Sequence, residues 1–205
     1  MYPAKPGLTI AFHGCDEQVR DDVVSHKSML TFKKNPYDWL GNGMYFWENN
    51  QQRALDFATE LHLSPRRNSP VVKVPSVIGA VIDLGFCLDL MDGEYIKLIQ
   101  ESHGTLLDSF KTLDIKMPVN RDAKGSQDLL MRDLDCAVIE NLHLQRKKNK
   151  LNPFDSARGL FVEGGQVYEG AGFHKKNHIQ ICIRNPNCIK GFFIPRLSDN
   201  KYPIP

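Results

Sequence analysis

The chain has 205 residues, of which 41% are hydrophobic, and its formal net charge at pH 7 is +2. This length and composition predict a single domain, residues 1–205, with a core of its own. The near-neutral charge means that the chain as a whole is not strongly basic, as a general nucleic-acid-binding protein would be. A local basic patch on its surface is still compatible with this charge. No apolar run is long enough to cross a bilayer, and no secretory leader is apparent, so no membrane contact is expected.

Five cysteines occur, and no two of them form a Cys-x-x-Cys pair. An odd number of isolated cysteines is typical of a reduced protein and matches neither a disulfide framework nor a zinc site. The sequence therefore predicts a cytoplasmic protein without a metal.

The first predicted strand, Leu8–Phe12, is followed directly by His13 and Gly14. Its residues are mostly strand formers, with a mixed alternation of apolar and polar types. Asp16 then has the position of an N-cap for the next helix. A lone histidine at a strand end is usually an ordinary satisfied side chain. A histidine directly before a glycine at such a place favours a ligand-holding role.

A Gly-Asn-Gly turn leads into the second predicted strand, Met44–Trp47, whose aromatic and apolar residues favour that conformation. Asn49 is predicted to cap a helix over Asn50–Leu61. The strand carries Tyr45 and the helix carries Phe57. Two aromatic side chains placed in this way can hold a planar ring between them.

The middle of the chain predicts two further strands and two helices. Val71–Val74 and Val77–Leu84 are rich in valine and isoleucine and are separated by a proline. A helix is predicted to begin at Asp92, and the clearest helical periodicity covers Ser126–Leu144. The basic segment Arg146–Lys150 follows it and fits either a solvated helix end or a phosphate-contacting patch.

The C-terminal third predicts strands and loops. Two glycines at positions 164–165 give a hairpin signal between Gly159–Glu163 and Gln166–Glu169. His178–Ile183 alternates strictly, which predicts a strand. Cys188–Ile194 predicts the last strand.

Two of these motifs, taken in order, resemble the ADP-ribosyltransferase superfamily. The His13-Gly14 pair, followed by Gly-x-Gly-Met-Tyr-Phe at Gly41–Phe46 and then a helix, is similar to the branch of diphtheria toxin and the poly-ADP-ribose polymerases. The resemblance covers Leu8–Pro195. It implies an α+β fold with an ADP-ribosyltransferase-like split β-sheet core and flanking helices.

The resemblance implies NAD as a co-substrate and no metal. Nicotinamide would lie between Tyr45 and Phe57. Its carboxamide would pair with the backbone of Gly14, where no side chain blocks the peptide N–H and C=O. His13 and Gln180 would hold ribose hydroxyls, with His13 as a donor. Nicotinamide would then leave, and an acceptor would attack the ribose.

The chain departs from the family at one position. A glutamate that stabilises the cation-like transition state in the family corresponds to Gln180 here, and an amide carries no charge for that task. Two nearby carboxylates, Glu163 and Glu169, are candidates to supply the charge. We expect Glu169 to do so, because its loop leads directly into the strand of Gln180. For each glutamate, an ordinary solvated strand end is the alternative.

The leading hypothesis is an ADP-ribosyltransferase that modifies RNA, DNA or protein as a bacterial toxin or defence effector, with an antitoxin as a further partner. The basic residues at His174–Lys176 and Arg146–Lys150 favour nucleic acid as the acceptor. One alternative is an NAD glycohydrolase, in which water is the acceptor. The other is an inactive module that binds NAD or ADP-ribose, which Gln180 favours.

Overall fold

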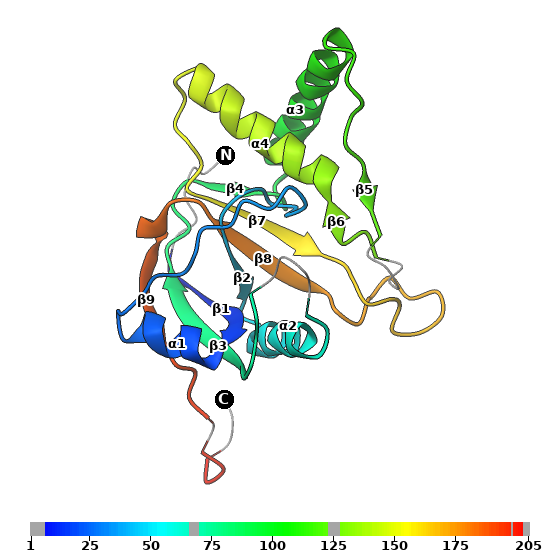
Figure 1. Ribbon diagram of the computed structural model, residues 1–205. Coiled ribbons are helices and arrows are strands. Elements are labelled where there is room, and N and C mark those ends of the chain that lie inside the picture. Colours follow the sequence, from blue (N-terminus) through cyan, green and yellow to red (C-terminus); the bar gives the residue numbers. More distant parts are fainter. Residues whose placement is uncertain (1–6, 66–69, 123–127, 198, 203–205) are drawn as a thin grey trace.

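The computed structural model describes residues 7–65, 70–122, 128–197 and 199–202. A mixed seven-stranded sheet forms the centre, and the described residues contain four α-helices, so the predicted α+β class is confirmed (Figure 1). The strands of the sheet, in chain order, are β1 (Thr9–Asp16), β2 (Met44–Glu48), β3 (Pro75–Ile82), β4 (Cys87–Asp89), β7 (Ser156–Phe161), β8 (His178–Ile183) and β9 (Ile189–Phe193). The other elements are α1 (Glu17–Val24), α2 (Gln51–Leu63), α3 (Gly93–Thr112), α4 (Asp133–Lys148), the two-stranded ladder of β5 (Asn120–Arg121) and β6 (Met131–Arg132), and the 3₁₀ turn η1 (Pro186–Cys188).

The strand order places the two motif-bearing strands side by side. It is β4-β7-β8-β2-β1-β3-β9, so β2 has β8 on one side and β1 on the other, both antiparallel to it. β1 pairs with β2 only as far as Phe12 opposite Trp47, whereas its ladder with β3 continues to Asp16 opposite Pro75. The sheet therefore opens between β1 and β2 at His13.

The two faces of the sheet carry different layers, because residues two apart on a strand share a face. On one face, called the α1 face, Ile78 of β3 packs with Val23 of α1. On the other, called the helix face, α2 lies over β1 and β3, while α3 and α4 pack together over β4 and β7 (Figure 1). Between these helices, β2 and β8 carry most of the side chains considered below.

Local sequence explains where the helices begin. Asp16 caps α1 and Asp92 caps α3, as predicted, each with its carboxylate on a peptide N–H of the first turn. α2 is capped by Asn50, whose side chain accepts from the peptide N–H of Arg53. The predicted cap, Asn49, is wrong: this residue has a left-handed φ of 48° and turns the chain before the helix.

Two predicted elements have different bounds or do not form. α4 begins at Asp133 and not at Ser126, which lies outside the described residues. Its acidic first turn and basic last turn both suit the helix dipole. Val71–Val74 is not a strand, because two peptide N–H groups of this region bond to the carboxylate of Asp16 and not to a neighbouring strand.

The predicted hairpin is also wrong. Gly164 and Gly165 do turn the chain, with φ of 84° and 71°. However, the strand before them ends at Phe161 and pairs antiparallel with β8. Residues 162–177, called the β7–β8 loop, connect the two strands, and an isolated bridge within this loop takes the place of the second predicted strand.

Candidate functional site

His13 follows the last residue of β1 that pairs with β2. Its side chain bonds to β2 beyond that point. Its Nδ1 donates to the carbonyl oxygen of Tyr45 across 2.7 Å, and its ring centroid is 5.8 Å from that of Phe46. Burial lowers the pKa of His13, so the imidazole is neutral at pH 7. Because Nδ1 carries the proton, Nε2 is an acceptor, and the predicted donation to a ribose hydroxyl is reversed in direction.

Gly14 is required by the packing of α2 on β1. A Cβ atom at this position would lie 2.0 Å from the carbonyl oxygen of Ala54. The two backbones therefore approach more closely than any residue with a side chain allows. This gives the glycine a structural role of its own, and its pairing with a carboxamide stays a prediction.

Trp39, Tyr45 and Gln180, called the paired cluster, have polar atoms that bond to the chain itself. The Tyr45 hydroxyl donates to the carbonyl oxygen of Gly41 across 2.8 Å and accepts from the peptide N–H of Leu40 across 3.0 Å. The indole N–H of Trp39 donates to Oε1 of Gln180 across 2.8 Å. Burial raises the pKa of Tyr45 well above its ordinary value. Tyr45 therefore anchors the turn that precedes β2.

Phe57 lies against Trp47 and not against Tyr45. The ring centroids of Phe57 and Trp47 are 5.0 Å apart, within the apolar cluster that α2 forms on the sheet. Tyr45 packs into a different cluster, near Leu40 and Cys182. The aromatic surface beside Phe57 is thus supplied by the next helix-face residue along β2.

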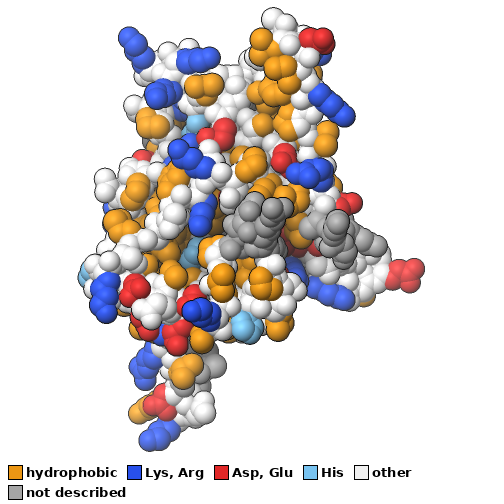
Figure 2. All heavy atoms as spheres, viewed as in Figure 1, with side chains coloured by type: hydrophobic (Ala, Val, Ile, Leu, Met, Phe, Trp, Pro, Cys, Tyr) orange, Lys and Arg blue, Asp and Glu red, His pale blue; other side chains and the backbone are white. Residues whose placement is uncertain are grey.

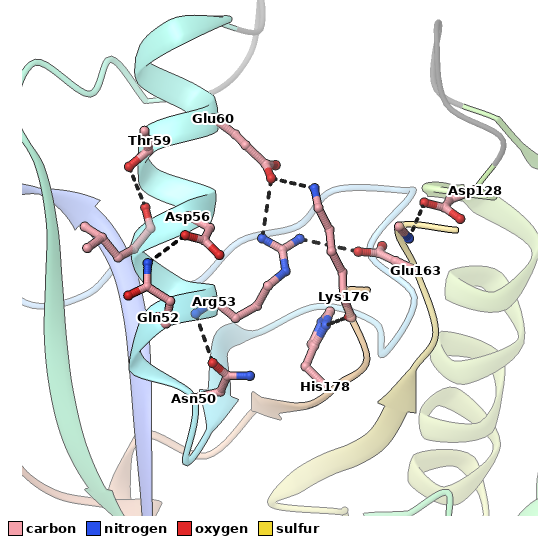
Figure 3. Close-up of polar contacts among 12 residues, drawn as sticks. Asn50, Gln52, Arg53, Asp56, Thr59, Glu60, Asp128, Glu163, Lys176 and His178 are labelled. Carbon is pink, nitrogen blue, oxygen red and sulfur yellow. Dashed lines mark hydrogen bonds and ion pairs between the residues drawn. The ribbon is translucent and has the colours of Figure 1, made fainter. Parts of the chain in front are cut away.

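Five side chains from α2, the β7–β8 loop and β8 point toward one another and form the Arg53 cluster: Arg53, Glu60, Glu163, Lys176 and His178 (Figure 3). Arg53 Nη2 lies 3.4 Å from Glu163 Oε2, and Arg53 Nη1 lies 3.7 Å from Glu60 Oε1. Lys176 Nζ lies 2.7 Å from the same oxygen of Glu60. Arg53 is 9% exposed, and Glu163 and His178 are 5% exposed, so three polar groups are buried together.

Burial dominates the electrostatics of this cluster. It raises the pKa of Glu163, while the charges of Arg53 and Lys176 act in the opposite direction and that of Asp128 adds to the rise. The guanidinium of Arg53 also lies over the ring of Trp47, 5.9 Å from its centroid. Since a buried site screens charges weakly, an ionised Glu163 interacts strongly with any positive charge that develops near it.

Four buried nitrogen atoms around the Trp47 ring have no hydrogen-bond partner within the described ranges: Arg53 Nε, Arg53 Nη1, Trp47 Nε1 and His178 Nε2. The ring of His178 lies 6.2 Å from that of Trp47 and stacks on Phe161 at 5.2 Å. Each unpaired buried polar atom costs about 1–3 kcal/mol. Such atoms are therefore rare, and this group marks a place for ligand atoms or ordered water.

His178 presents an acceptor at this place. Its Nδ1 donates to the carbonyl oxygen of Lys176 across 2.6 Å. Burial lowers the pKa of His178 to about 4, so the ring is neutral at pH 7. With the proton on Nδ1, the unpartnered Nε2 carries a lone pair.

The two candidate glutamates have different surroundings. Glu163 belongs to the Arg53 cluster, whereas Glu169 is exposed in the β7–β8 loop. A carboxylate in a fixed, buried position is better suited to electrostatic catalysis than one that water solvates. The geometry therefore favours Glu163, the alternative of the two sequence candidates.

Arg53, Trp47 and His178 are not among the site residues that the sequence patterns predict. Arg53 has a detectable signal, because it lies on the core-facing side of α2 with the half-buried Phe57 and the buried Leu61, at i+4 and i+8. A charged residue on such a stripe requires a partner or a ligand. Trp47 and His178 lack a comparable signal, since aromatic rings in strand patterns are ordinary core residues.

Within residues 7–65, 70–122, 128–197 and 199–202, no group of three or more His, Cys, Asp or Glu side chains is arranged to hold a metal ion. No helix among these residues has the length and apolar character needed to cross a membrane. Comparison with protein-family models, curated proteins and solved structures gives no match. Function is therefore inferred from the residues and their geometry.

Proposed function

We propose that the chain is an ADP-ribosyltransferase, which cleaves the nicotinamide–ribose bond of NAD and transfers ADP-ribose to a macromolecular acceptor. One observation carries the proposal. The strands that bear His13, Tyr45 and Gln180 are neighbours in the order β1-β2-β8, although their residues come from distant parts of the sequence. The early end of the β1–β2 ladder supports the finer assignment of a split ADP-ribosyltransferase-like sheet.

In this proposal Glu163 supplies the negative charge that Gln180 lacks. When the glycosidic bond breaks, nicotinamide leaves with the bonding electron pair and positive charge develops on the ribose. A fixed carboxylate in a buried site stabilises that charge better than water does. Arg53, 3.4 Å from Glu163, favours the ionised carboxylate.

The acceptor step needs a base. The acceptor oxygen or nitrogen forms a bond to the anomeric carbon and loses its proton. Glu169, exposed in the β7–β8 loop, is the carboxylate that we propose takes this proton from an acceptor arriving from solvent.

The remaining motif residues bind NAD in this proposal. His13 Nε2 accepts from one ribose hydroxyl, since Nδ1 already donates to the carbonyl oxygen of Tyr45. Gln180 uses its amide nitrogen as a donor to another, because its amide oxygen is bonded to Trp39. Phe57 offers aromatic surface to a planar ring.

The acceptor is proposed to be RNA, DNA or protein, and the chain is proposed to act in the bacterial cytoplasm as a toxin or defence effector that an antitoxin restrains. Lys147 and Lys148 are exposed at the C-terminal end of α4, where Figure 2 shows Lys and Arg side chains gathered. This favours nucleic acid. By contrast, Lys176 is ion-paired and Arg146 stacks on aromatic rings, so both serve the fold.

The test uses NAD labelled in its adenine half, incubated with the full chain and a bacterial lysate. We expect free nicotinamide to appear and the label to enter the macromolecular fraction, where nuclease or protease digestion identifies the acceptor. Glu163→Gln, checked for an unchanged thermal midpoint, is the matched control and should transfer far less label. If the chain neither binds nor cleaves NAD, the proposal is wrong.

A binding module without catalysis is the second candidate. The observation that favours it is Gln180, whose side-chain oxygen is already bonded to Trp39. Such a module would bind NAD or ADP-ribose and release no nicotinamide. An NAD glycohydrolase would release nicotinamide without labelling any macromolecule, so the same experiment separates all three functions.

A further inference from the structure

We infer that the unpartnered nitrogen atoms around Trp47 bind a phosphorylated ribose. The phosphate oxygens would accept from Arg53 and Trp47, and a sugar hydroxyl would donate to His178. The inference deepens the proposed function, because it rests on a nucleotide-type ligand and names the atoms that recognise it.

Arg53 has donors to spare. Its nearest carboxylate oxygens, on Glu163 and Glu60, lie at 3.4 and 3.7 Å. Both distances exceed the roughly 2.7–2.9 Å of a charge-assisted hydrogen bond. Lys176, by contrast, lies 2.7 Å from Glu60, so these two charges compensate each other. Arg53 is therefore the under-coordinated cation of the cluster, and its Nε and Nη1 hydrogens await an acceptor.

Trp47 adds a neutral donor next to this cation. Trp47 is 4% exposed, and its Nε1 has no hydrogen-bond partner among the described residues. The guanidinium of Arg53 lies 5.9 Å from the centroid of the Trp47 ring. Indole nitrogen is a donor only, and guanidinium is a donor only. Buried donors that include a formal positive charge favour an oxyanion, and phosphate is the oxyanion whose geometry suits a guanidinium.

His178 makes the site selective for a sugar phosphate. Its Nε2 carries a lone pair, because Nδ1 donates to the carbonyl oxygen of Lys176. The esterified phosphates of a dinucleotide have no hydrogen to offer it, whereas the hydroxyls of a ribose do. A ligand that carries hydroxyls next to a phosphate satisfies all of the unpartnered atoms together.

Glu163 competes with the phosphate for Arg53. The charged groups that face Glu163 are Arg53 from α2, Lys176 from the β7–β8 loop, and Asp128. Removing the charge of Glu163 should free Arg53 for the phosphate. We therefore expect Glu163→Gln to bind ADP several-fold more tightly, although the same change slows catalysis.

Calorimetric titration of the full chain with ADP and with 2′,3′-dideoxy-ADP tests this site without any NAD cleavage. We expect the wild type to bind ADP more tightly than the dideoxy compound. Arg53→Gln should weaken both ligands about tenfold or more, because a hydrogen bond to a charged group has that strength. His178→Phe, which keeps a ring against Phe161, should abolish the preference for ADP and leave the dideoxy affinity unchanged.

The exposed Arg121→Gln is the control for a lost positive charge and should bind like the wild type. If Arg53→Gln does not fold, Arg53→Lys and Trp47→Phe replace it, and each should weaken both ligands. Unchanged affinities in folded Arg53 and Trp47 variants, or equal wild-type affinity for the two ligands, would overturn the inference.

Two further results assign the source of the phosphate and separate this site from the proposed activity. ADP-ribose and a short 5′-phosphorylated RNA are titrated in turn, and the ligand that depends on Arg53 identifies either the dinucleotide or the acceptor as the source. Binding of ADP that depends on Arg53, in a chain that releases no nicotinamide, supports the site and contradicts the transferase. Nicotinamide release with a wild-type KM in Arg53→Gln supports the transferase and contradicts a site for NAD.

Discussion

The paired cluster and the side chains around Trp47, namely Trp47, Arg53 and His178, both involve β2 and β8, but their polar atoms differ in whether they have hydrogen-bond partners. In the paired cluster, Trp39 Nε1 and the Tyr45 hydroxyl have partners within the chain. Around Trp47, three side chains keep buried nitrogen atoms that have no hydrogen-bond partner in the described part of the chain. Because an unpaired buried donor or acceptor is costly, the hydrogen bonds of Trp39 and Tyr45 serve the fold, whereas the unpaired atoms around Trp47 are available to a ligand.

The residues of the expected motifs and the residues with unpaired polar atoms are different. Tyr45 and Gln180 are the residues that the resemblance emphasises, and their side chains hold the segment before β2 in place. Arg53 and His178 belong to no expected motif, and they carry the unsatisfied groups. In this chain, the motif strands therefore organise a site whose chemistry depends on neighbouring residues.

The largest expected effect is on catalysis and belongs to the Arg53 cluster. Glu163→Gln should lower the rate of nicotinamide release by about 10²–10³, the usual loss when one preorganised electrostatic group is removed. Glu169→Gln, exposed in the same loop, should retain the initial release rate. Steady-state assays of both variants decide between the two glutamates. Full activity of Glu163→Gln would show that the Arg53 cluster does not supply the charge that catalysis needs.

The next prediction concerns the packing of α2 on β1 at Gly14, since α2 carries Arg53. Gly14→Ala should lower the free energy of unfolding by about 1–3 kcal/mol, because the added methyl group overlaps the backbone of Ala54. Gly104→Ala is the matched control: a Cβ there meets nothing within 4 Å, and α3 should gain about 0.5–1 kcal/mol. Urea unfolding measures both. A Gly14→Ala protein of normal stability would mean that α2 shifts freely on β1.

Acid should weaken the fold through the buried histidines. Burial lowers the pKa of His178 and of His143 to about 4, from an ordinary 6.5. Between these pH values the unfolded chain binds protons that the folded chain excludes, so stability falls as the pH falls through that window. We expect a loss on the order of 1–3 kcal/mol per histidine between pH 7 and 4.5.

The histidine variant sharpens this prediction. In His178→Phe the unfolding free energy should depend less on pH between 7 and 4.5 than in the wild type, when both are followed by urea titration. An equal pH dependence would mean that folding does not lower the pKa of His178.

The smallest effect compares the two tryptophans directly. Trp39→Phe and Trp47→Phe remove the same atoms, and Trp39 is the less buried of the two, so the cavity effect is no larger at Trp39. Trp39→Phe also leaves the oxygen of Gln180 unpaired and should be about 1 kcal/mol less stable than Trp47→Phe. Equal stabilities in thermal and urea unfolding would show that the Trp39 hydrogen bond contributes nothing.

Sequence patterns predicted the local features of the fold. The strand His178–Ile183 and the caps Asp16 and Asp92 agree with the structure, because alternation and capping depend on residues close together in the chain. The prediction of a hairpin at residues 164–165 was wrong because β7 pairs with β8 and not with the segment directly after the turn. Pairing of that kind is decided by the whole sheet.

The candidate site was predictable only in part. His13, Tyr45 and Gln180 were expected on three strands, and these strands are neighbours. Which polar atoms stay unpaired depends on packing between distant segments, such as Trp39 on Gln180 and Arg53 beside Glu163. The spacing of residues along the chain does not predict such contacts.

The two indole N–H groups can report directly on whether a ligand binds at Trp47, since Trp39 and Trp47 are the only tryptophans in the chain. Their two resonances in a proton–nitrogen correlation spectrum are assigned with Trp39→Phe and Trp47→Phe, and ADP-ribose is added to the nitrogen-15-labelled wild type. We predict that the Trp47 resonance moves, because its unpaired indole N–H gains an acceptor, and that the Trp39 resonance stays in place, because the Trp39 indole is already bonded to Gln180. Movement of the Trp39 resonance alone, or of neither resonance at saturating ADP-ribose, would contradict it.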